Sequence, residues 1–326
     1  MTTLFNSIPH AFGPVPSRRL GKSLGINNIP PKVCTYSCVY CQLGKTSKNV
    51  VERQSFYPSS SILEEVQKRV VNAERRNEKI DYLTFVPDGE PTLDVNLGEE
   101  ISRLKRIGIP VAVITNASML SLSDVRQDLL NADYVSLKVD AVSTDLWRKI
   151  DRPHKDLKLK AILEGIRKFA ETFEGTMVTE TMLIEGVNYA NEFERIARFL
   201  ADLKKLKKAY IAVPTRPAAE NWVKSAKEEV VNATFQVFSQ RLGAERVEYL
   251  IGYEGNAFGF TGSAEEDLLS IMAVHPMRDE AVEAFLRKAK ASWQIIGELL
   301  AADKLVEVEY EGNRYYMRKL FPMKSN

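Results

Sequence analysis

Short apolar segments alternate with amphipathic segments through the middle of the chain, and this alternation constrains the fold more than any other feature. Apolar residues recur at strand spacing in the first kind of segment and at helical spacing in the second. The predicted strands cover residues 82–86, 111–115, 134–139, 177–184 and 209–213. The predicted helices cover residues 60–75, 97–107, 123–131, 157–173 and 192–203. A strict rotation of strand and helix predicts an α/β fold with parallel strands and right-handed crossovers.

One more strand is expected before this region, at residues 23–28, which gives about six strands. Six strands are too few to close an eight-stranded barrel, so they predict an open, partial barrel. In parallel α/β folds, ligands gather at the carboxyl ends of the strands. Polar residues that follow the predicted strands should therefore share one rim of the barrel.

Three groups of polar residues fall at this rim. They are Asp88, Gly89, Glu90 and Pro91 after one strand, Thr115 and Asn116 after the next, and Ser136, Lys138 and Asp140 along a third. A glycine between acids lets the backbone approach a ligand, a carboxylate accepts from an ammonium, and hydroxyl and amide groups bond a sugar. Each group also has an ordinary explanation: a turn, a helix cap, or a lysine that extends to solvent.

The three cysteines of the chain, Cys34, Cys38 and Cys41, fall within eight residues. Three thiolates can hold three irons of a [4Fe-4S] cluster and leave the fourth iron open to a small-molecule ligand. A zinc site is one alternative, although no histidine lies at a knuckle spacing, and inert thiols are another. An odd cysteine count argues against disulfides. The spacing therefore favours an iron–sulfur site.

The cysteine loop and the acidic turn together resemble the signatures of radical S-adenosylmethionine (radical SAM) enzymes. The loop is similar to the C-x3-C-x-aromatic-C pattern, with Tyr40 in the aromatic position, and residues 88–91 resemble the Gly-Gly-Glu-Pro motif. The resemblance covers about residues 18–213 and implies a partial (β/α)6 barrel with one [4Fe-4S] cluster and S-adenosylmethionine (SAM). Asp88 departs from the family, which usually has glycine there, and its side chain could narrow the pocket.

The resemblance also implies roles for individual residues. The three cysteines would hold three irons, and the methionine moiety of SAM would chelate the fourth. Residues 88–91 would hold the methionine amino group, Thr115 and Asn116 the ribose, and Ser136 the carboxylate. An electron from a donor such as a ferredoxin or flavodoxin would cleave SAM to a 5′-deoxyadenosyl radical, which abstracts hydrogen from a substrate. The protein would supply orientation and a dry cavity.

Within the superfamily, the front half of the chain resembles the group likened to the tRNA wyosine-base synthase. Residues 13–44 carry this likeness, and residues 135–140, 149–153 and 183–188 fit it. The wyosine enzyme binds a second cluster through three additional cysteines, which this chain lacks. We therefore expect a one-cluster enzyme with a different reaction, acting on tRNA, on a protein or on a small metabolite.

Five residues near the rim are candidates for contact with the substrate: Arg18, Arg19, Lys138, Asp140 and Arg216. Arginine favours a phosphate or carboxylate because its guanidinium can form two parallel hydrogen bonds to either. The alternative is that Arg18 and Arg19 pair with surface acids. The roles of Lys138 and Asp140 differ among subfamilies.

The pattern changes near residue 262, which predicts one domain at residues 1–262 and a second at residues 263–326. The second would contain helices at residues 264–273, 278–289 and 292–302 and a hairpin at residues 305–310 and 314–319. Three helices and a hairpin resemble a winged helix. An iron–sulfur redox-sensing regulator that binds DNA is therefore the rival from another class.

Charge argues against DNA binding by this second domain. From residue 263 onward there are nine basic and eleven acidic residues, and residues 292–300, the presumed recognition helix, contain no Arg or Lys. We expect a protein-docking or substrate-capping role instead. Tyr310, Tyr315 and Tyr316 are expected to be packing residues, and His275 a helix cap.

The overall composition is that of an ordinary globular protein. The 326 residues carry a formal net charge of +2, which neither requires nor excludes a nucleic-acid partner. No apolar run approaches the length of a membrane span, and the first ten residues have neither the basic flank nor the apolar core of a signal peptide. We expect a cytoplasmic protein with no membrane partner.

Overall fold

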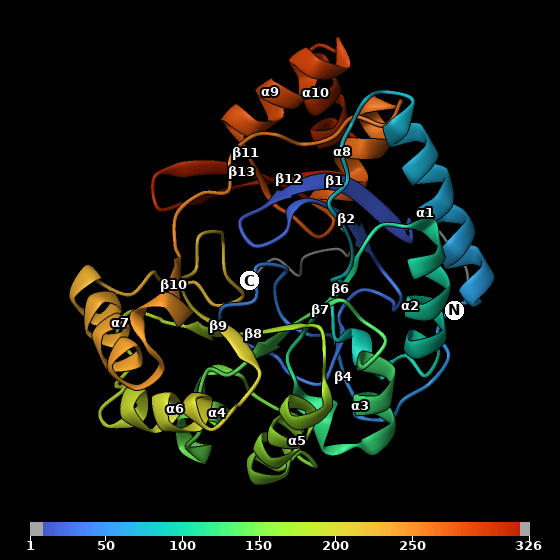
Figure 1. The fold of residues 1–326 in the computed structure, drawn as a ribbon. Coiled ribbons are helices and arrows are strands. Elements are labelled where there is room, and N and C mark those ends of the chain that lie inside the picture. The colour runs from blue at the N-terminus through green and yellow to red at the C-terminus, as the bar shows by residue number, and fades with distance from the viewer. Residues whose placement is uncertain (1–8, 320–326) are drawn as a thin grey trace.

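The computed structural model describes residues 9–319 of the chain. An eight-stranded sheet lies inside a layer of helices, and a smaller group of helices and strands lies over one edge of the sheet (Figure 1). The first eight residues, on which the expectation about a signal peptide falls, lie outside the described range, as does the end of the predicted second domain.

The large sheet is mostly parallel. Its strands are β1 (Ala11–Ser17), β2 (Gly21–Ile26), β5 (Tyr82–Phe85), β6 (Val111–Thr115), β7 (Tyr134–Lys138), β8 (Thr176–Met182), β9 (Leu206–Ala212) and β10 (Val247–Leu250). They follow the order β1-β2-β5-β6-β7-β8-β9-β10, with β1 antiparallel to β2 and all other neighbours parallel. The expected α/β fold with an open sheet is confirmed.

Two strands of the sheet, β1 and β10, were not predicted. β1 contains Pro14 and Pro16, which remove backbone donors and are found at sheet edges, and β1 indeed forms the edge. β10 is only four residues long and extends the parallel sheet beyond β9. The sheet is therefore wider than the six strands indicated by the sequence.

Helices cover the outer side of the sheet (Figure 1). Those that match predicted segments are α1 (Ser59–Glu74), α2 (Leu97–Leu104), α3 (Ser123–Leu129), α5 (Leu159–Thr172) and α6 (Glu192–Ala201). Two others, α4 (Thr144–Ile150) and α7 (Glu228–Leu242), were not predicted. The sequence of α7 contains three valines and two phenylalanines, residue types that favour strands and weaken the helical signal.

Short segments complete this part of the chain. They are the two-residue strands β3 (Val33–Cys34) and β4 (Lys48–Asn49) and the 3-10 turns η2 (Pro91–Leu93), η3 (Lys105–Ile107), η4 (Ser118–Ser121) and η5 (Ala244–Arg246). The helix expected at residues 97–107 divides into α2 and η3, and Gly108 follows with a left-handed φ of 87°. No described helix is long and apolar enough to cross a lipid bilayer.

Alternate side chains of the parallel strands enter different apolar clusters. Val135 and Leu137 of β7 pack in the large core that includes the helices. Tyr134, from the same strand, packs with Ala112 and Leu20 in a smaller cluster. Because side chains alternate along a strand, Ser136 and Lys138 share the side of Tyr134, inside the curved sheet.

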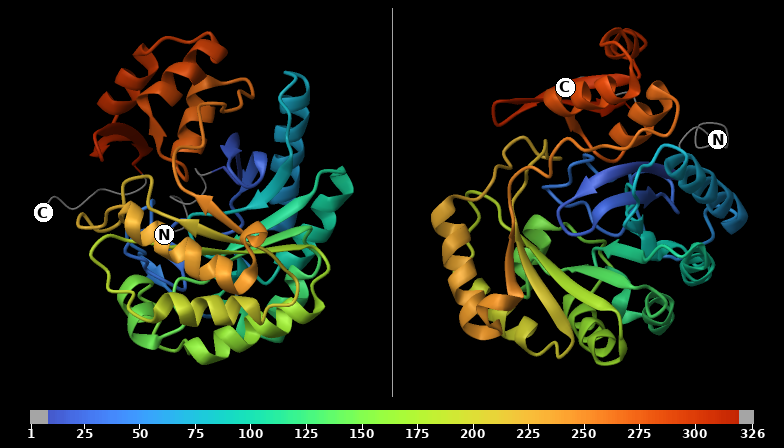
Figure 2. Two further views of the ribbon diagram at one scale, coloured as in Figure 1. Left: turned by 60° about the vertical axis from the view of Figure 1, so that its left-hand side comes forward. Right: turned by 45° about the horizontal axis from the view of Figure 1, so that its top comes forward.

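The C-terminal module, residues 263–319, lies over β1 and β2 (Figure 2). It contains α8 (Ala264–Met272), β11 (Met277–Arg278), α9 (Asp279–Ala289), α10 (Gln294–Ala301), β12 (Leu305–Tyr310) and β13 (Asn313–Arg318). The three strands form an antiparallel sheet in the order β11-β13-β12. The expected helices and hairpin are present, with β11 in addition, and the assignment as a winged helix stays a prediction.

The apolar core of this module also includes residues that precede residue 263 in the sequence. Phe12 and Val15 of β1, together with Phe258, belong to the same buried apolar cluster as α8 and α9. Tyr315 and Tyr316 are buried, as expected for packing residues. The division of the chain at residue 262 stays a prediction. β1 pairs with β2 of the large sheet and also packs against the helices of the C-terminal module.

Candidate cofactor site

A cavity of about 340 Å³, here called the cofactor cavity, lies at the carboxyl ends of the parallel strands and gathers most of the predicted site residues. Those that line it are Arg18, Arg19, Cys34, Cys38, Tyr40, Cys41, Asp88, Gly89, Glu90, Thr115, Asn116, Ser136, Lys138 and Arg216. Two predicted residues are not part of its lining. Pro91 begins η2, and Asp140 lies behind Tyr40.

The acidic turn packs directly on the cysteine loop. The amide of Glu90 donates to the carbonyl of Val33 at 3.2 Å, and the amide of Lys32 donates to the carbonyl of Asp88 at 2.8 Å. Gly89 lies between them, and a Cβ atom at this position would be 2.0 Å from the Val33 carbonyl oxygen. The close backbone approach predicted for Gly89 is therefore made to the cysteine loop.

Glu90 joins the ends of two neighbouring strands. Its buried carboxylate accepts hydrogen bonds from the amide and hydroxyl of Thr92, the hydroxyl of Thr115 and the amide of Asn116, at 2.6 to 3.1 Å. Burial raises the pKa of Glu90, and these donors oppose the rise. The carboxylate orders the rim, which is a role that the sequence did not indicate.

Asp88, the other acid of the acidic turn, has a carboxylate oxygen that accepts no hydrogen bond from the described residues. Its Oδ1 lies 3.2 Å from Nζ of Lys32, whereas its buried Oδ2 has no hydrogen-bond partner among the described residues. Burial raises the pKa of Asp88 to about 6, with Lys32 opposing the rise. An unpaired buried oxygen at the cavity is suited to a cationic ligand group such as an ammonium.

Burial of the cysteine loop favours the protonated form of all three thiols, because it raises their pKa values. Burial, followed by the charge of Glu90, raises the pKa of Cys34 to about 12. Burial also raises the pKa of Cys38, which lies 3.6 Å from Asp151, and that of Cys41. Iron would displace these protons, because a coordinated thiol is deprotonated.

No three Cys, His, Asp or Glu side chains within residues 9–319 are gathered as ligands of a single metal ion would be. A [4Fe-4S] cluster does not require such a group, because its thiolates bind different irons. Asn116 Nδ2 lies 3.6 Å from Cys34 Sγ and 2.7 Å from Thr35 Oγ1. Asn116 therefore faces the cysteine loop, where a hydrogen bond to a sulfur of a bound cluster would tune the reduction potential of that cluster.

Charged side chains from three segments form a network along one wall of the cavity. Glu180 of β8 binds Lys138 at 2.6 Å and pairs with Arg19, which also donates to Ser136 Oγ at 3.1 Å. Although burial opposes it, Lys138 and Arg19 lower the pKa of Glu180 to about 2. The partner of Arg19 is therefore not a surface acid. It is Glu180, an acid of the barrel interior whose side chain is only 12% exposed.

Tyr40 contacts Lys138, a member of this network, and two further acids. Its single hydroxyl proton is shared between Asp140 and Asp151, the latter at 2.9 Å, and its ring lies 4.8 Å from Nζ of Lys138. Asp140 also accepts from the amide of Met182 at 2.6 Å. Asp140 thus contacts the cysteine loop through Tyr40 and is not part of the cavity lining, and its role as a substrate contact stays a prediction.

Sequence reasoning missed Glu180 and misassigned His275. Glu180 is a charged residue within a predicted strand and pairs in register with Lys138, so the alternating pattern could have indicated it. His275 was expected to cap a helix, but it is buried, and its Nε2 lies 2.8 Å from Arg216 and from Glu254. Those residues are distant in sequence, and no local pattern indicates the contact.

The comparisons with known proteins agree with this geometry. The family model described as Radical SAM superfamily matches residues 28–200. A Methanocaldococcus jannaschii protein described as "UPF0026 protein MJ1312" is 46% identical over 311 residues, which are 95% of this chain and 96% of that protein.

Two solved structures share the fold at low sequence identity. A radical SAM methyltransferase from Sphaerobacter thermophilus has a TM-score of 0.53 at 16% identity, covering 73% of this chain and 69% of that one. TYW1 with a lysine-pyruvate adduct bound has a TM-score of 0.50 at 12% identity, covering 67% and 73%. On the family match and the close relative, the chain belongs to the radical SAM superfamily.

Proposed function

We propose that this protein is a radical SAM enzyme that binds one [4Fe-4S] cluster through Cys34, Cys38 and Cys41 and binds SAM in the cofactor cavity. The observation that carries the proposal is the contact between two motifs that lie far apart in the sequence. The acidic turn hydrogen-bonds to the cysteine loop, and both line one cavity. When bound, these groups would supply one-electron cleavage of SAM to a 5′-deoxyadenosyl radical for hydrogen abstraction.

The residues of the cavity suit the two ends of the methionine moiety. Asp88 Oδ2 is an unpaired acceptor for the amino group. Ser136 Oγ, with Arg19 at 3.1 Å, offers a hydroxyl and a cation for the carboxylate. Glu90 would hold Thr115 and Asn116 in place from behind, through the hydrogen bonds described above.

The substrate of hydrogen abstraction is a tRNA, a protein or a small metabolite. The likeness to TYW1 concerns the fold. The chain has three cysteines, which suffice for one cluster. An electron donor such as a ferredoxin or flavodoxin would reduce the cluster, and the C-terminal module would cap the cavity.

The test is anaerobic reconstitution with iron and sulfide, followed by reduction with dithionite and chromatography of the products. We expect 5′-deoxyadenosine and methionine from the wild type and neither from Cys38→Ala. Ser47→Ala, an exposed position on the same loop, is the matched control and should retain cleavage.

The proposal fails if the reduced, cluster-loaded protein leaves SAM intact. It also fails if Cys38→Ala behaves like the wild type. If the protein instead binds duplex DNA in a salt-sensitive manner that depends on the cluster, the regulator interpretation replaces the enzyme.

A further inference from the structure

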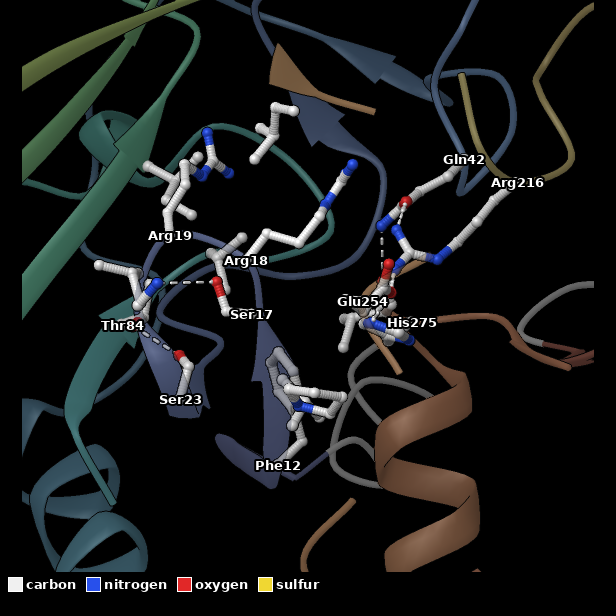
Figure 3. Close-up of a pocket in the computed structure, with 17 residues that line it drawn as sticks. Phe12, Ser17, Arg18, Arg19, Ser23, Gln42, Thr84, Arg216, Glu254 and His275 are labelled. Carbon is white, nitrogen blue, oxygen red and sulfur yellow. Dashed lines mark hydrogen bonds and ion pairs between the residues drawn. The ribbon is translucent and has the colours of Figure 1, made fainter. Parts of the chain in front are cut away.

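A second, smaller cavity opens beside the cofactor cavity. This side chamber has a volume of about 140 Å³ and shares Arg18, Arg19, Gln42 and Arg216 with the larger cavity (Figure 3). Its other walls come from β1, β2, residues of β5, β6 and β10, and the segment after α8, including His275. A group bound in the chamber would therefore lie next to SAM.

The side chamber has an excess of positive charge. Three arginines line it, and Glu254 is the single acidic residue in its lining. Burial, followed by the charge of Arg216, lowers the pKa of His275 well below its ordinary value, so this histidine is neutral. The side chains of the lining thus sum to a charge of +2 when Glu254 is ionised, and Glu180, outside the lining, pairs with one of the arginines, Arg19.

Two of the three arginines are already paired. Arg19 binds Glu180 and Ser136. Arg216 donates to Gln42 Oε1 at 2.6 Å and pairs with Glu254. The buried Nε of Arg216 has no hydrogen-bond partner among the described residues and remains available as a donor.

Arg18 is the arginine without a partner. Within residues 9–319 it forms no hydrogen bond or ion pair, and it is exposed to solvent. Its side chain extends between Arg19 on one side and the Gln42–Arg216 pair on the other (Figure 3). Glu180 attracts the Arg18 guanidinium without contacting it, and Arg19 repels it, so an incoming anion would be its first direct partner.

We propose that the side chamber binds an anionic group of the substrate, a phosphate or a carboxylate, with Arg18 as its principal ligand. The inference rests on the proposed function, because it assigns the substrate of that same site. The chamber is smaller than the roughly 300 Å³ at which pockets for whole drug-sized ligands begin, so it suits a terminal group. The rest of the substrate would extend into the cofactor cavity.

Binding to the folded state can be measured through thermal unfolding. An anion that binds the native protein raises the melting temperature as its concentration increases. The cluster-loaded full chain with SAM would be titrated with inorganic phosphate in one arm and with acetate in the other. Sodium chloride keeps the ionic strength constant, which removes general salt effects.

We expect saturable stabilisation by at least one of the two anions. Arg18→Gln should raise the fitted Kd about tenfold or more, because a charge-assisted pair of hydrogen bonds is lost. The matched control is Arg106→Gln, which removes the same charge at an exposed arginine of η3 and should leave Kd within about twofold. The arm that responds identifies the anion as phosphate or carboxylate.

The inference is wrong if neither anion stabilises the wild type, or if Arg18→Gln and Arg106→Gln have the same Kd. Reductive cleavage of SAM by the wild type, measured in the same preparation, tests the proposed function separately, since it requires no substrate anion. Cleavage without anion binding overturns only the side-chamber inference. Anion binding without cleavage overturns the proposed enzyme function and, with it, the assignment of the anion to a substrate, and leaves an anion site of another role.

Discussion

The cofactor cavity and the side chamber share a wall but are built in different ways. In the cofactor cavity, sequence motifs meet through backbone contacts, and Glu90 alone accepts four hydrogen bonds. In the side chamber, β1, β2, a loop and the C-terminal module meet around charged groups, and Arg18 is left without a partner. The first cavity is preorganised by the chain itself, whereas the second lacks a counter-charge that a ligand can supply.

The largest effect is expected from Gly89→Ala, which acts on the cofactor cavity alone. The new Cβ would lie 2.0 Å from the Val33 carbonyl oxygen, so the acidic turn and the cysteine loop must separate. We expect a loss of about 3 kcal/mol in the free energy of unfolding and little bound iron. Urea unfolding and iron analysis after reconstitution measure the two quantities.

Gly297→Ala is the control for this substitution. A Cβ at Gly297 in α10 has no atom within 4 Å, so the change should stabilise the helix by about 1 kcal/mol and leave the iron content unchanged. Normal iron content in Gly89→Ala would contradict the conclusion that the packing of the turn on the loop forms the cofactor cavity.

Glu180→Gln acts on the wall that the two cavities share. It leaves Arg19 and Lys138 without their common counter-charge, and we expect a loss of about 3 kcal/mol in the free energy of unfolding near neutral pH. Urea unfolding of Glu180→Gln measures this loss. The exposed Glu248→Gln, which removes a surface pair with Lys208, is the control and should change stability little.

The pH dependence gives an independent check on Glu180. Its pKa is lowered from 4.5 to about 2 in the folded protein, so its stabilisation is complete above about pH 4.5. That stabilisation is lost as the pH falls through about 2, because below this pH Glu180 is protonated in both the folded and the unfolded state. The difference between wild type and Glu180→Gln should shrink over this interval. A constant difference would show that the loss comes from packing and not from charge.

The features that the sequence predicted depend on local patterns. Alternation along β7 places Ser136 and Lys138 on the interior side, and the acidic turn follows β5 at the expected rim. The rotation of strands and helices predicted the parallel pairing that β2 to β10 show. These are interactions between neighbours in the sequence or between successive elements, so short windows contain the necessary information.

The features that escaped prediction depend on contacts between distant residues. Arg19 and Glu180 are 161 residues apart, and Arg216 and His275 are 59 residues apart. A lone histidine before a proline has the local pattern of a cap, and only the packing of the C-terminal module on the rim shows its true partners. The side chamber could not be derived from the sequence because no single segment contains it.

A smaller effect is expected from Asp88→Asn, which tests the free acceptor in the cofactor cavity. An amide in this position keeps the shape but loses the charge that would hold the amino group of SAM. We expect about a tenfold weaker affinity for SAM, measured by calorimetry on the cluster-loaded protein. Asp156→Asn, at an exposed acid, is the control. Equal affinity for SAM in the two variants would mean that Asp88 only forms the ion pair with Lys32 and does not bind SAM.

The smallest effect is expected from Tyr315→Phe, which acts on the side chamber alone. The buried Tyr315 hydroxyl donates to the Thr215 carbonyl at 2.8 Å and so attaches the C-terminal module to the residue before Arg216. Its loss should lower the free energy of unfolding by about 1 kcal/mol and weaken the binding of the chamber anion about twofold.

The iron content of Tyr315→Phe should stay unchanged, because the cofactor cavity is held by its own hydrogen bonds. Tyr310→Phe is the control, since that hydroxyl lies 3.5 Å from the Pro214 carbonyl and contributes less. If iron content falls together with anion binding, the C-terminal module stabilises both cavities. The cofactor cavity would then not be preorganised independently of the side chamber.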